Sequence, residues 1–336
     1  MTPLSIPKPR LAWFILKVHS WYVRIVIRGS LLLATAALLR ADPPSVSSPD
    51  ASVQVDDKQI SVAQPSSKIL QDASLDYTYV GDAGLKTGTG GNLGEQTTRF
   101  GYGIKAPVTD QWSLNFGLNY NRIDFGQPAG SPLPFSLETL TATFGATYKL
   151  SDQWSFFGDV VPRLELLDGW NQVESGDFQL GGALGANYEV NPDLSLRFGV
   201  AINPGTTGLP VMPLLGLRWR FAEAWSLNFG FPRTSIDYQI LPNLRLSPLE
   251  LGFEGGSFHT DSTYGNSVGM PNLNDRNLNY REVRAGVGAA YDVTKNVQVG
   301  LNAGAVVYRE FDFSNANFTP SVEPAPYVQA GVKVGF

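Results

Sequence analysis

The chain has no cysteine and only two histidines, His19 and His259, among its 336 residues. Without cysteine no disulfide can stabilise the fold, so stability has to come from backbone pairing and side-chain packing. Histidine is the usual general base and the commonest metal ligand at neutral pH. Its near absence therefore excludes most histidine-dependent catalysis and most histidine metal sites.

Charge is also scarce. Charged residues make up 16% of the chain, which is below the usual quarter for soluble domains. The 25 Lys and Arg residues are outnumbered by 30 Asp and Glu residues, and no basic stripe is present. This mildly acidic balance argues against nucleic acid as a partner. The chain is instead rich in glycine, with 35 residues, and in aromatic residues, at 12%.

One alternating stretch sets the pattern for the rest of the chain. From Trp112 to Tyr120, large apolar residues alternate with small or polar ones, and a turn at residues 109–111 comes before them. Side chains on a strand alternate between two faces, so this stretch predicts a strand with one apolar and one polar face. A turn that leads into an alternating strand recurs at residues 152–158, 192–199 and 223–230.

The amino terminus has the plan of a secretory signal peptide at residues 1–41. A basic region without acidic residues leads into a short apolar run, Ser30 to Leu39, with cleavage expected after Ala41. A retained signal anchor is an alternative, as is a later start near Ile27. Residues 42–71 lack periodicity and predict a flexible periplasmic segment, or alternatively a plug or tether of the following domain.

From residue 72 to 336 the alternation hardly stops, and short turns alternate with long loops. Short turns on one rim and long loops on the other are the plan of an outer-membrane barrel, and strands of about 10 residues match a tilted crossing of the bilayer. Aromatic residues next to the turns, such as Trp112 and Trp154, indicate an interfacial girdle. The short turns lie near 108–111, 151–153, 191–193, 222–224, 241–243 and 292–296, and the long loops near 83–95, 126–136, 166–176, 259–278 and 312–324.

The expected fold is therefore an all-β, transmembrane antiparallel up-and-down barrel of about 14 strands. Twelve strands are the alternative if Pro232-Arg233 and residues 241–243 do not turn the chain. A change of parity near Pro248 predicts a β-bulge, where proline is tolerated. An exported soluble β-sandwich would show the same alternation, but it would not explain second faces rich in Gly, Ser, Thr and Asn as well as a polar lumen does.

Several motifs carry a family resemblance. These are the repeated turn motif Asp/Glu-x-Trp-Ser-x-x-Phe-Gly, the segment 228–233 (Asn-Phe-Gly-Phe-Pro-Arg) and the segment 251–256 (Leu-Gly-Phe-Glu-Gly-Gly). With them, residues 74–336 resemble an outer-membrane β-barrel family known only as a domain of unknown function. The resemblance supports the fold and implies no activity and no functional residues.

The polar faces of the predicted strands supply the candidate functional residues. Their charges are of mixed sign, whereas a strongly selective pore shows one dominant sign. They either pair across strands and hold the barrel closed, or line a water-filled passage. The predicted lumen-lining residues are Arg99, Lys105, Lys149, Asp159, Arg163, Glu189, Arg197, Arg218, Arg220, Asp237, Glu282, Arg284 and Lys333.

These observations predict a passive, porin-like channel for small solutes in the outer membrane, reached by signal-peptide-directed export. The alternatives are a closed structural or adhesion barrel that acts through its outer loops, and a transporter of small hydrophobic compounds. The expected partners are outer-membrane lipid and the assembly machinery, because the terminal Phe336 resembles the carboxyl-terminal signature that this machinery reads. Oligomeric state does not follow from the sequence.

Catalysis and metal binding are not expected. Ser257, His259 and Asp261 are close in sequence, but strand geometry rarely brings residues two positions apart into triad contact. The cluster of Asn272, Asn274 and Asp275 lacks the spacing of a known calcium loop. We therefore predict no enzymatic activity, no catalytic residue, no metal site and no cofactor.

Overall fold

The computed structural model describes residues 69–86, 90–128, 130–171, 173–202 and 211–336. The predicted signal peptide and nearly all of the predicted periplasmic segment, residues 42–71, lie outside the described residues. The first strand begins at Leu70, two residues before the predicted start of the barrel.

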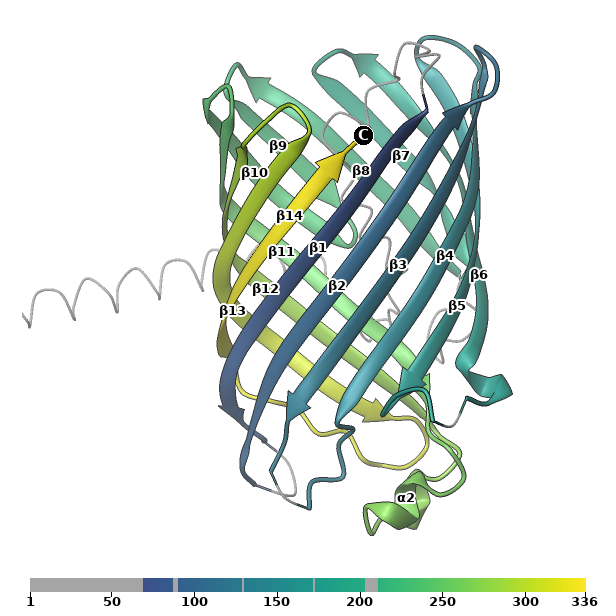
Figure 1. Ribbon diagram of the computed structural model, residues 1–336, viewed down its shortest axis with the longest axis vertical. Helices are drawn as coiled ribbons and strands as arrows, with labels where there is room; N and C mark the ends of the chain where they lie inside the picture. Colours follow the sequence, from purple (N-terminus) through teal and green to yellow (C-terminus); the bar gives the residue numbers. More distant parts are fainter. Residues whose placement is uncertain (1–68, 87–89, 129, 172, 203–210) are drawn as a thin grey trace, which may run out of the picture. The chain divides into compact units, whose positions relative to one another are not determined.

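Within the described residues, fourteen antiparallel strands form a closed barrel in which every strand pairs with its neighbours in chain order and β1 pairs with β14 (Figure 1). One short helix, α2 (Tyr264–Ser267), and two 3-10 turns, η1 (Ser175–Asp177) and η2 (Pro271–Leu273), lie in the loops. No helix among the described residues is long and apolar enough to cross a membrane. The strands are β1 (Leu70–Gly84), β2 (Asn92–Pro107), β3 (Trp112–Gly126), β4 (Ser136–Lys149), β5 (Trp154–Leu167), β6 (Phe178–Asn191), β7 (Leu194–Ile202), β8 (Val211–Ala222), β9 (Trp225–Gly230), β10 (Arg233–Leu241), β11 (Leu244–His259), β12 (Asn277–Asp292), β13 (Val297–Phe313) and β14 (Ala325–Gly335).

The prediction of a 14-strand up-and-down barrel is confirmed, and the 12-strand alternative is wrong. Phe231 and Pro232 separate β9 from β10, and residues 242–243 separate β10 from β11. All six predicted short turns are present on one rim, which we call the turn rim. The carboxyl terminus lies at this rim, and α2 lies at the opposite one, which we call the loop rim (Figure 1).

Hydroxyl side chains close three of the tight turns in the same way. Oγ1 of Thr109 accepts hydrogen bonds from the backbone N–H groups of Gln111 and Trp112, at 3.2 and 3.0 Å. Ser151 and Thr294 make the equivalent pairs of bonds in their own turns. A hydroxyl that bonds to backbone two and three residues ahead favours a turn over continued pairing, so the chain reverses there.

The outward face of the barrel is apolar. On β1, the side chains of Leu75, Tyr77 and Tyr79 are 50, 46 and 51% exposed. Thr78 and Val80, which have the opposite parity on the same strand, are buried. Apolar side chains this exposed on strand after strand are stable where the surrounding solvent is lipid. The alternation read from the sequence thus matches the two faces of the wall.

Aromatic pairs mark the turn rim on the outside. Trp112 lies opposite Tyr148 with ring centroids 4.9 Å apart, and Trp154 lies opposite Tyr188 at 4.6 Å. Trp225 pairs with Tyr238 in the same way. Each tryptophan begins a rising strand and packs on a tyrosine of a neighbouring strand, which is the arrangement of an interfacial girdle.

Register shifts occur in several strand pairs, and two of them change which side chains of β11 and β13 face inward. The predicted bulge near Pro248 is confirmed, because the register shifts between Ser247 and Glu250. A second shift, between Val283 and Arg284 of β12, was not predicted from the sequence. After such a shift the opposite parity of residues faces the interior.

We expect arginine to be tolerated on one face of β3 and not on the other. Phe116 packs against Phe144 on the outside with ring centroids 5.4 Å apart, whereas Nδ2 of Asn115 donates to Thr147 on the inside. Phe116→Arg should lower the free energy of unfolding in a bilayer by about 2–4 kcal/mol, because lipid does not solvate the charge. Asn115→Arg, the matched control, should be near neutral in the same denaturant titration. Equal effects at both positions would contradict the assignment of faces.

Candidate functional site

Contacts between distant strands identify the interior. In the barrel wall β2 and β12 are separated by β1, β14 and β13. Arg284 of β12 nevertheless forms a 2.8 Å ion pair with Glu95 of β2, and the hydroxyl of Tyr280 lies 3.0 Å from Oε2 of the same Glu95. Side chains of strands so far apart along the wall meet only inside the barrel. The face that carries these residues therefore faces the interior.

A buried network of ion pairs spans this interior. Arg284 also pairs with Glu254 at 2.8 Å, and Arg309 pairs with Glu95 at 2.9 Å and with Glu282 at 2.7 Å. An isolated buried charge costs several kcal/mol, but here three carboxylates balance three guanidinium groups. We call this network the ion cluster; its members are Glu95, Arg99, Glu254, Glu282, Arg284 and Arg309.

Between the ion cluster and the loop rim the interior is filled by apolar side chains. The ring of Phe125 on β3 packs edge-on against Tyr280 and Phe311 from the far wall, with centroids 5.8 and 5.2 Å apart. Tyr264 of α2 donates a 2.8 Å hydrogen bond to the carbonyl of Pro132, and burial raises the pKa of its hydroxyl. We call this packing the loop plug; its buried residues include Leu93, Phe125, Leu133, Phe258, Tyr264, Leu273, Leu278, Phe311 and Phe313.

In the half of the barrel next to the loop rim, which we call the loop half, a second set of side-chain contacts crosses the interior. Nε2 of Gln179 on β6 donates a 2.9 Å hydrogen bond to the carbonyl of Ser257 on β11, although four strands separate β6 from β11 in the wall. The same amide bonds to Glu165, which lies beside Arg163 at 3.9 Å. Side chains thus cross the interior along two different lines at this end of the barrel.

In the half of the barrel next to the turn rim, which we call the turn half, the inward side chains that the structure describes do not cross the interior. They lie along the wall, in space that glycines leave open. A Cβ built on Gly185 would come within 2.6 Å of Cζ of Phe157, so the Phe157 ring lies flat over this glycine on the neighbouring strand. The carboxylate of Asp76 lies over Gly331 in the same way. Most of the charged groups here remain half-buried, with 25% exposure for the side chain of Lys149 and 17% for that of Lys333, whereas Asp237 is buried.

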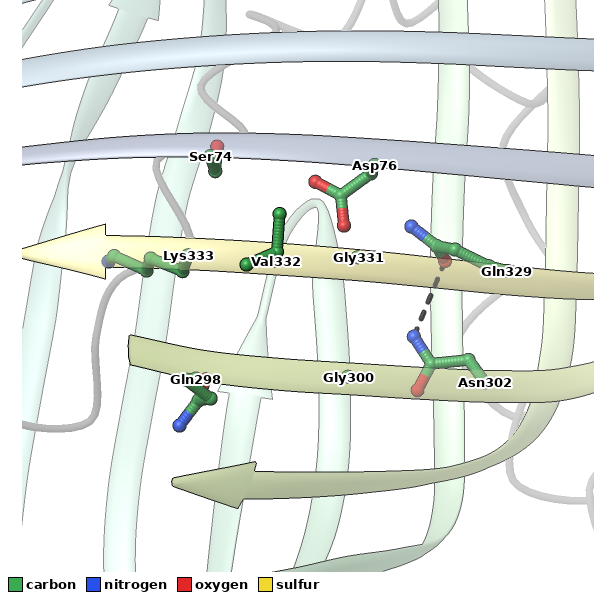
Figure 2. A pocket seen from close by; sticks show the side chains of 9 residues that line it. All are labelled: Ser74, Asp76, Gln298, Gly300, Asn302, Gln329, Gly331, Val332 and Lys333. Atoms are coloured by element: carbon green, nitrogen blue, oxygen red, sulfur yellow. Dashed lines mark hydrogen bonds between the residues drawn. The ribbon is translucent and has the colours of Figure 1, made fainter. Parts of the chain in front are cut away.

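A small polar recess shows this arrangement in detail (Figure 2). Asp76 on β1 points toward Gly331 on β14, and Nδ2 of Asn302 on β13 donates a 3.3 Å hydrogen bond to Gln329. The recess has a volume of about 30 Å³, enough for a water molecule or one polar group of a solute. Its lining is Ser74, Asp76, Gln298, Gly300, Asn302, Gln329, Gly331, Val332 and Lys333.

The predicted lumen-lining residues fall into three groups in the structure. Arg99, Glu282 and Arg284 belong to the ion cluster, and Arg163 and Asp237 are buried near other polar side chains. Arg220 is exposed at the turn rim, where it pairs with Asp193. The half-buried group of the turn half is Lys105, Lys149, Asp159, Glu189, Arg197, Arg218 and Lys333.

Sequence reasoning missed two residues at the centre of the ion cluster, Glu95 and Arg309. The sequence predicts a long loop over residues 83–95 that includes Glu95, but β2 already begins at Asn92. The alternation of Leu93, Glu95, Thr97 and Arg99 was the signal that could have extended this strand. Arg309 faces inward because of the register shift beside Arg284, for which the sequence gives no separate signal.

The side chains weighed for catalysis and metal binding have other partners. Ser257 Oγ donates to Asn279 at 3.0 Å, and Asp261 accepts hydrogen bonds from the backbone and hydroxyl of Thr263. Nδ1 of His259 lies 3.5 Å from Oδ1 of Asn277. The described residues contain no group of three or more His, Cys, Asp or Glu side chains arranged to hold a metal ion.

Comparisons with known proteins identify one family and several distantly similar solved structures. The model of a family described as "Domain of unknown function (DUF6268)" matches residues 105–335. No curated protein matches the chain. Among solved structures, a Pseudomonas aeruginosa FadL homologue is 10% identical and has a TM-score of 0.44, with 80% of this chain and 90% of that one covered. The COG4313 outer membrane channel from Pseudomonas putida F1 is 11% identical with a TM-score of 0.42, and 82% and 97% are covered.

A third solved structure, the KdgM porin, is 14% identical with a TM-score of 0.32, and 78% of this chain and 99% of that one are covered. At these low scores we draw nothing about function from any of the three likenesses.

Arg284→Met should destabilise the barrel strongly. The substitution removes the guanidinium that contacts Glu95, Glu254 and Glu282 and leaves buried carboxylates short of a partner. We expect a loss of about 3–5 kcal/mol in the free energy of unfolding, measured by denaturant titration in micelles.

Arg220→Met is the control for this prediction. It breaks an ion pair whose side chains are about half exposed, and it should cost less than about 1 kcal/mol. Similar losses for the two variants would show that the ion cluster does not hold the interior together.

Proposed function

We propose that this chain, which belongs to the family described as "Domain of unknown function (DUF6268)", is an outer-membrane channel for small solutes that is gated at its loop rim. The contrast between the two halves of the interior carries the proposal. In the turn half polar side chains lie along the wall, and in the loop half they cross the interior and are buried. A passage is thus kept open from the turn rim and closed at the other end.

The wall of the turn half suits polar solutes. It presents Ser74, Asp76, Asn302 and Lys333 over glycines that leave room beside them, and the charged side chains are half-buried. A transporter of hydrophobic compounds would need an apolar inner wall, and the polar lining of this half makes that alternative less favourable. Location in the outer membrane is supported by the apolar outer belt and the aromatic pairs at the turn rim.

One loop of the plug can move as a unit, whereas most of the other plug residues lie on the strands of the wall. Residues 260–276 contribute Tyr264 and Leu273 to the plug, and the two ends of this loop are joined by a 2.8 Å hydrogen bond from Thr260 N–H to the carbonyl of Arg276. The loop can therefore swing or be removed without separating β11 from β12. With the loop in place the ion cluster beneath it stays buried, so we expect the resting protein to be closed most of the time. Once the loop has moved, water reaches the ion cluster and frees it to rearrange.

A second candidate is a closed structural or adhesion barrel that acts through its loops. The plug itself favours it, because six paired charges and a layer of packed aromatic rings seal the loop end. The two candidates differ in one measurable property, which is conductance after the plug is removed.

We expect removal of the plug loop to open the channel. Residues 261–275 would be replaced by a two-residue Gly-Gly link between Thr260 and Arg276, whose backbones already lie side by side. In planar bilayers the wild-type chain should open rarely, whereas the shortened chain should give frequent, steady conductance steps. A folded, shortened barrel as silent as the wild type would overturn the channel in favour of the closed barrel.

A point variant tests the same gate without a deletion that could prevent folding. Tyr264→Ala removes one buried ring and its bond to Pro132 and should raise the open fraction in the same direction. Trp170→Ala serves as the control, because Trp170 is half exposed and bonds to Glu138 on the outer face. An equal change in conductance for both variants would contradict the assignment of the gate to the loop plug.

A further inference from the structure

Most arginines of the interior have a carboxylate partner, and two neighbouring ones do not. Arg99, Arg163, Arg233, Arg284 and Arg309 each form an ion pair with a glutamate. Arg197 and Arg218, in the turn half, form no ion pair and no side-chain hydrogen bond with any residue that the structure describes. Within the described part of the chain, the N–H donors of these two guanidinium groups are therefore not taken up by carboxylates, and both residues are half-buried.

An aromatic ring holds Arg197 in place instead. Its Cζ lies 4.1 Å from the centroid of the Phe157 ring, and that ring is 7% exposed. Phe157 in turn lies over Gly185, where a Cβ would collide with it. A guanidinium stacked on a ring keeps its N–H edges free for other partners. This explains why a large apolar residue occupies an inward position on an otherwise polar face.

Arg218 is close enough to share a ligand with Arg197. Arg197 lies opposite Gly216 across the β7–β8 pair, and Arg218 follows two residues later on the same face. Diagonal neighbours of this kind have backbones about 7–8 Å apart, within reach of two long side chains. Gly216 carries no side chain between them. An anion held between the two guanidinium groups would be attracted by both positive charges.

We propose that Arg197 and Arg218 form a binding site on the channel wall for a small oxyanion, a carboxylate or phosphate group carried by a solute. Arginine donates planar pairs of N–H bonds that match both groups. The site rests on the proposed function, because the solute has to enter from the turn rim. It gives that function a substrate class, namely small acidic solutes.

Three carboxylates lie near the site and do not fill it. Asp237 lies two strands away from Arg218, and its carboxylate accepts hydrogen bonds from Asn228, Ser235 and Ser247. Asp159 has an electrostatic effect on Arg197, but its carboxylate lies over Gly145 and no ion pair joins it to Arg197 among the described residues. Glu189 lies two strands away from Arg218, with Ser195 between them in the register, and it has interactions of its own. All three carboxylates will weaken the attraction for an anion, so we expect modest affinity and specificity for groups that accept paired hydrogen bonds.

Direct binding tests the site without any need for conductance. The refolded full-length chain, in zwitterionic micelles at neutral pH and low salt, would be titrated with inorganic phosphate and separately with acetate, followed by NMR of each anion. Arg197→Met and Arg218→Met should each weaken the binding of both anions about tenfold. Phe157→Leu should weaken it several-fold while both charges remain, because Arg197 loses the ring that orients it.

Arg220→Met is the matched control, since Arg220 is the next inward-parity arginine on β8 and already pairs with Asp193. It should leave both affinities unchanged. Equal weakening by all three arginine variants would reduce the effect to net charge and overturn the site, as would saturable binding that Arg197→Met leaves intact. Absence of binding by the wild type would overturn it too. If anion binding depends on Arg197 but the shortened chain shows no conductance in bilayers, the channel proposal is wrong and the binding-site proposal still holds.

Discussion

Closure of the sheet on itself is the constraint on which the structure depends. In lipid every backbone N–H and C=O group needs a partner within the protein, because no water is present to replace one. The register of β1 with β14 runs from Asp72 opposite Gly335 to Val80 opposite Tyr327, and the N–H of Phe336 bonds to the carbonyl of Gln71 at 2.8 Å. With no free edge, the wall has only two faces, and the period of two assigns every side chain to one of them.

The inner face satisfies its polar groups differently at the two ends. In the loop half they pair across the interior, as Arg284 does with Glu95, and exclude water. Burial of these charges is tolerated because carboxylates and guanidinium groups occur in equal number within one network. In the turn half, glycines such as Gly185 and Gly331 let neighbouring side chains lie flat, and most of the charged side chains are only half-buried. The loop end of the barrel is thus sealed where carboxylates and guanidinium groups pair across the interior, and the turn end stays accessible where glycines leave room along the wall.

Strand positions, tight turns and the number of strands could be predicted from the sequence, because alternation and turn chemistry are local. The separation of β9 from β10 at Phe231–Pro232, which decided between 12 and 14 strands, was already visible as a proline-containing break. Contacts across the interior could not be predicted, since they depend on how the strands are staggered around the barrel. Arg309 shows the limit most clearly, because one unpredicted register shift reverses the face it occupies.

Arg197 and Arg218 form no ion pair with a described carboxylate, and their position in the turn half follows from the difference between the two halves of the interior. In the loop half, a pair of uncompensated guanidinium groups would cost several kcal/mol of desolvation, and every arginine of the ion cluster has a glutamate beside it. Arg197 and Arg218 are instead half-buried, so part of each side chain stays in contact with solvent. The same solvent access would let an anion reach the two arginines. A solute that enters from the turn rim would therefore meet a cationic site before it reaches the neutral, buried cluster that closes the passage.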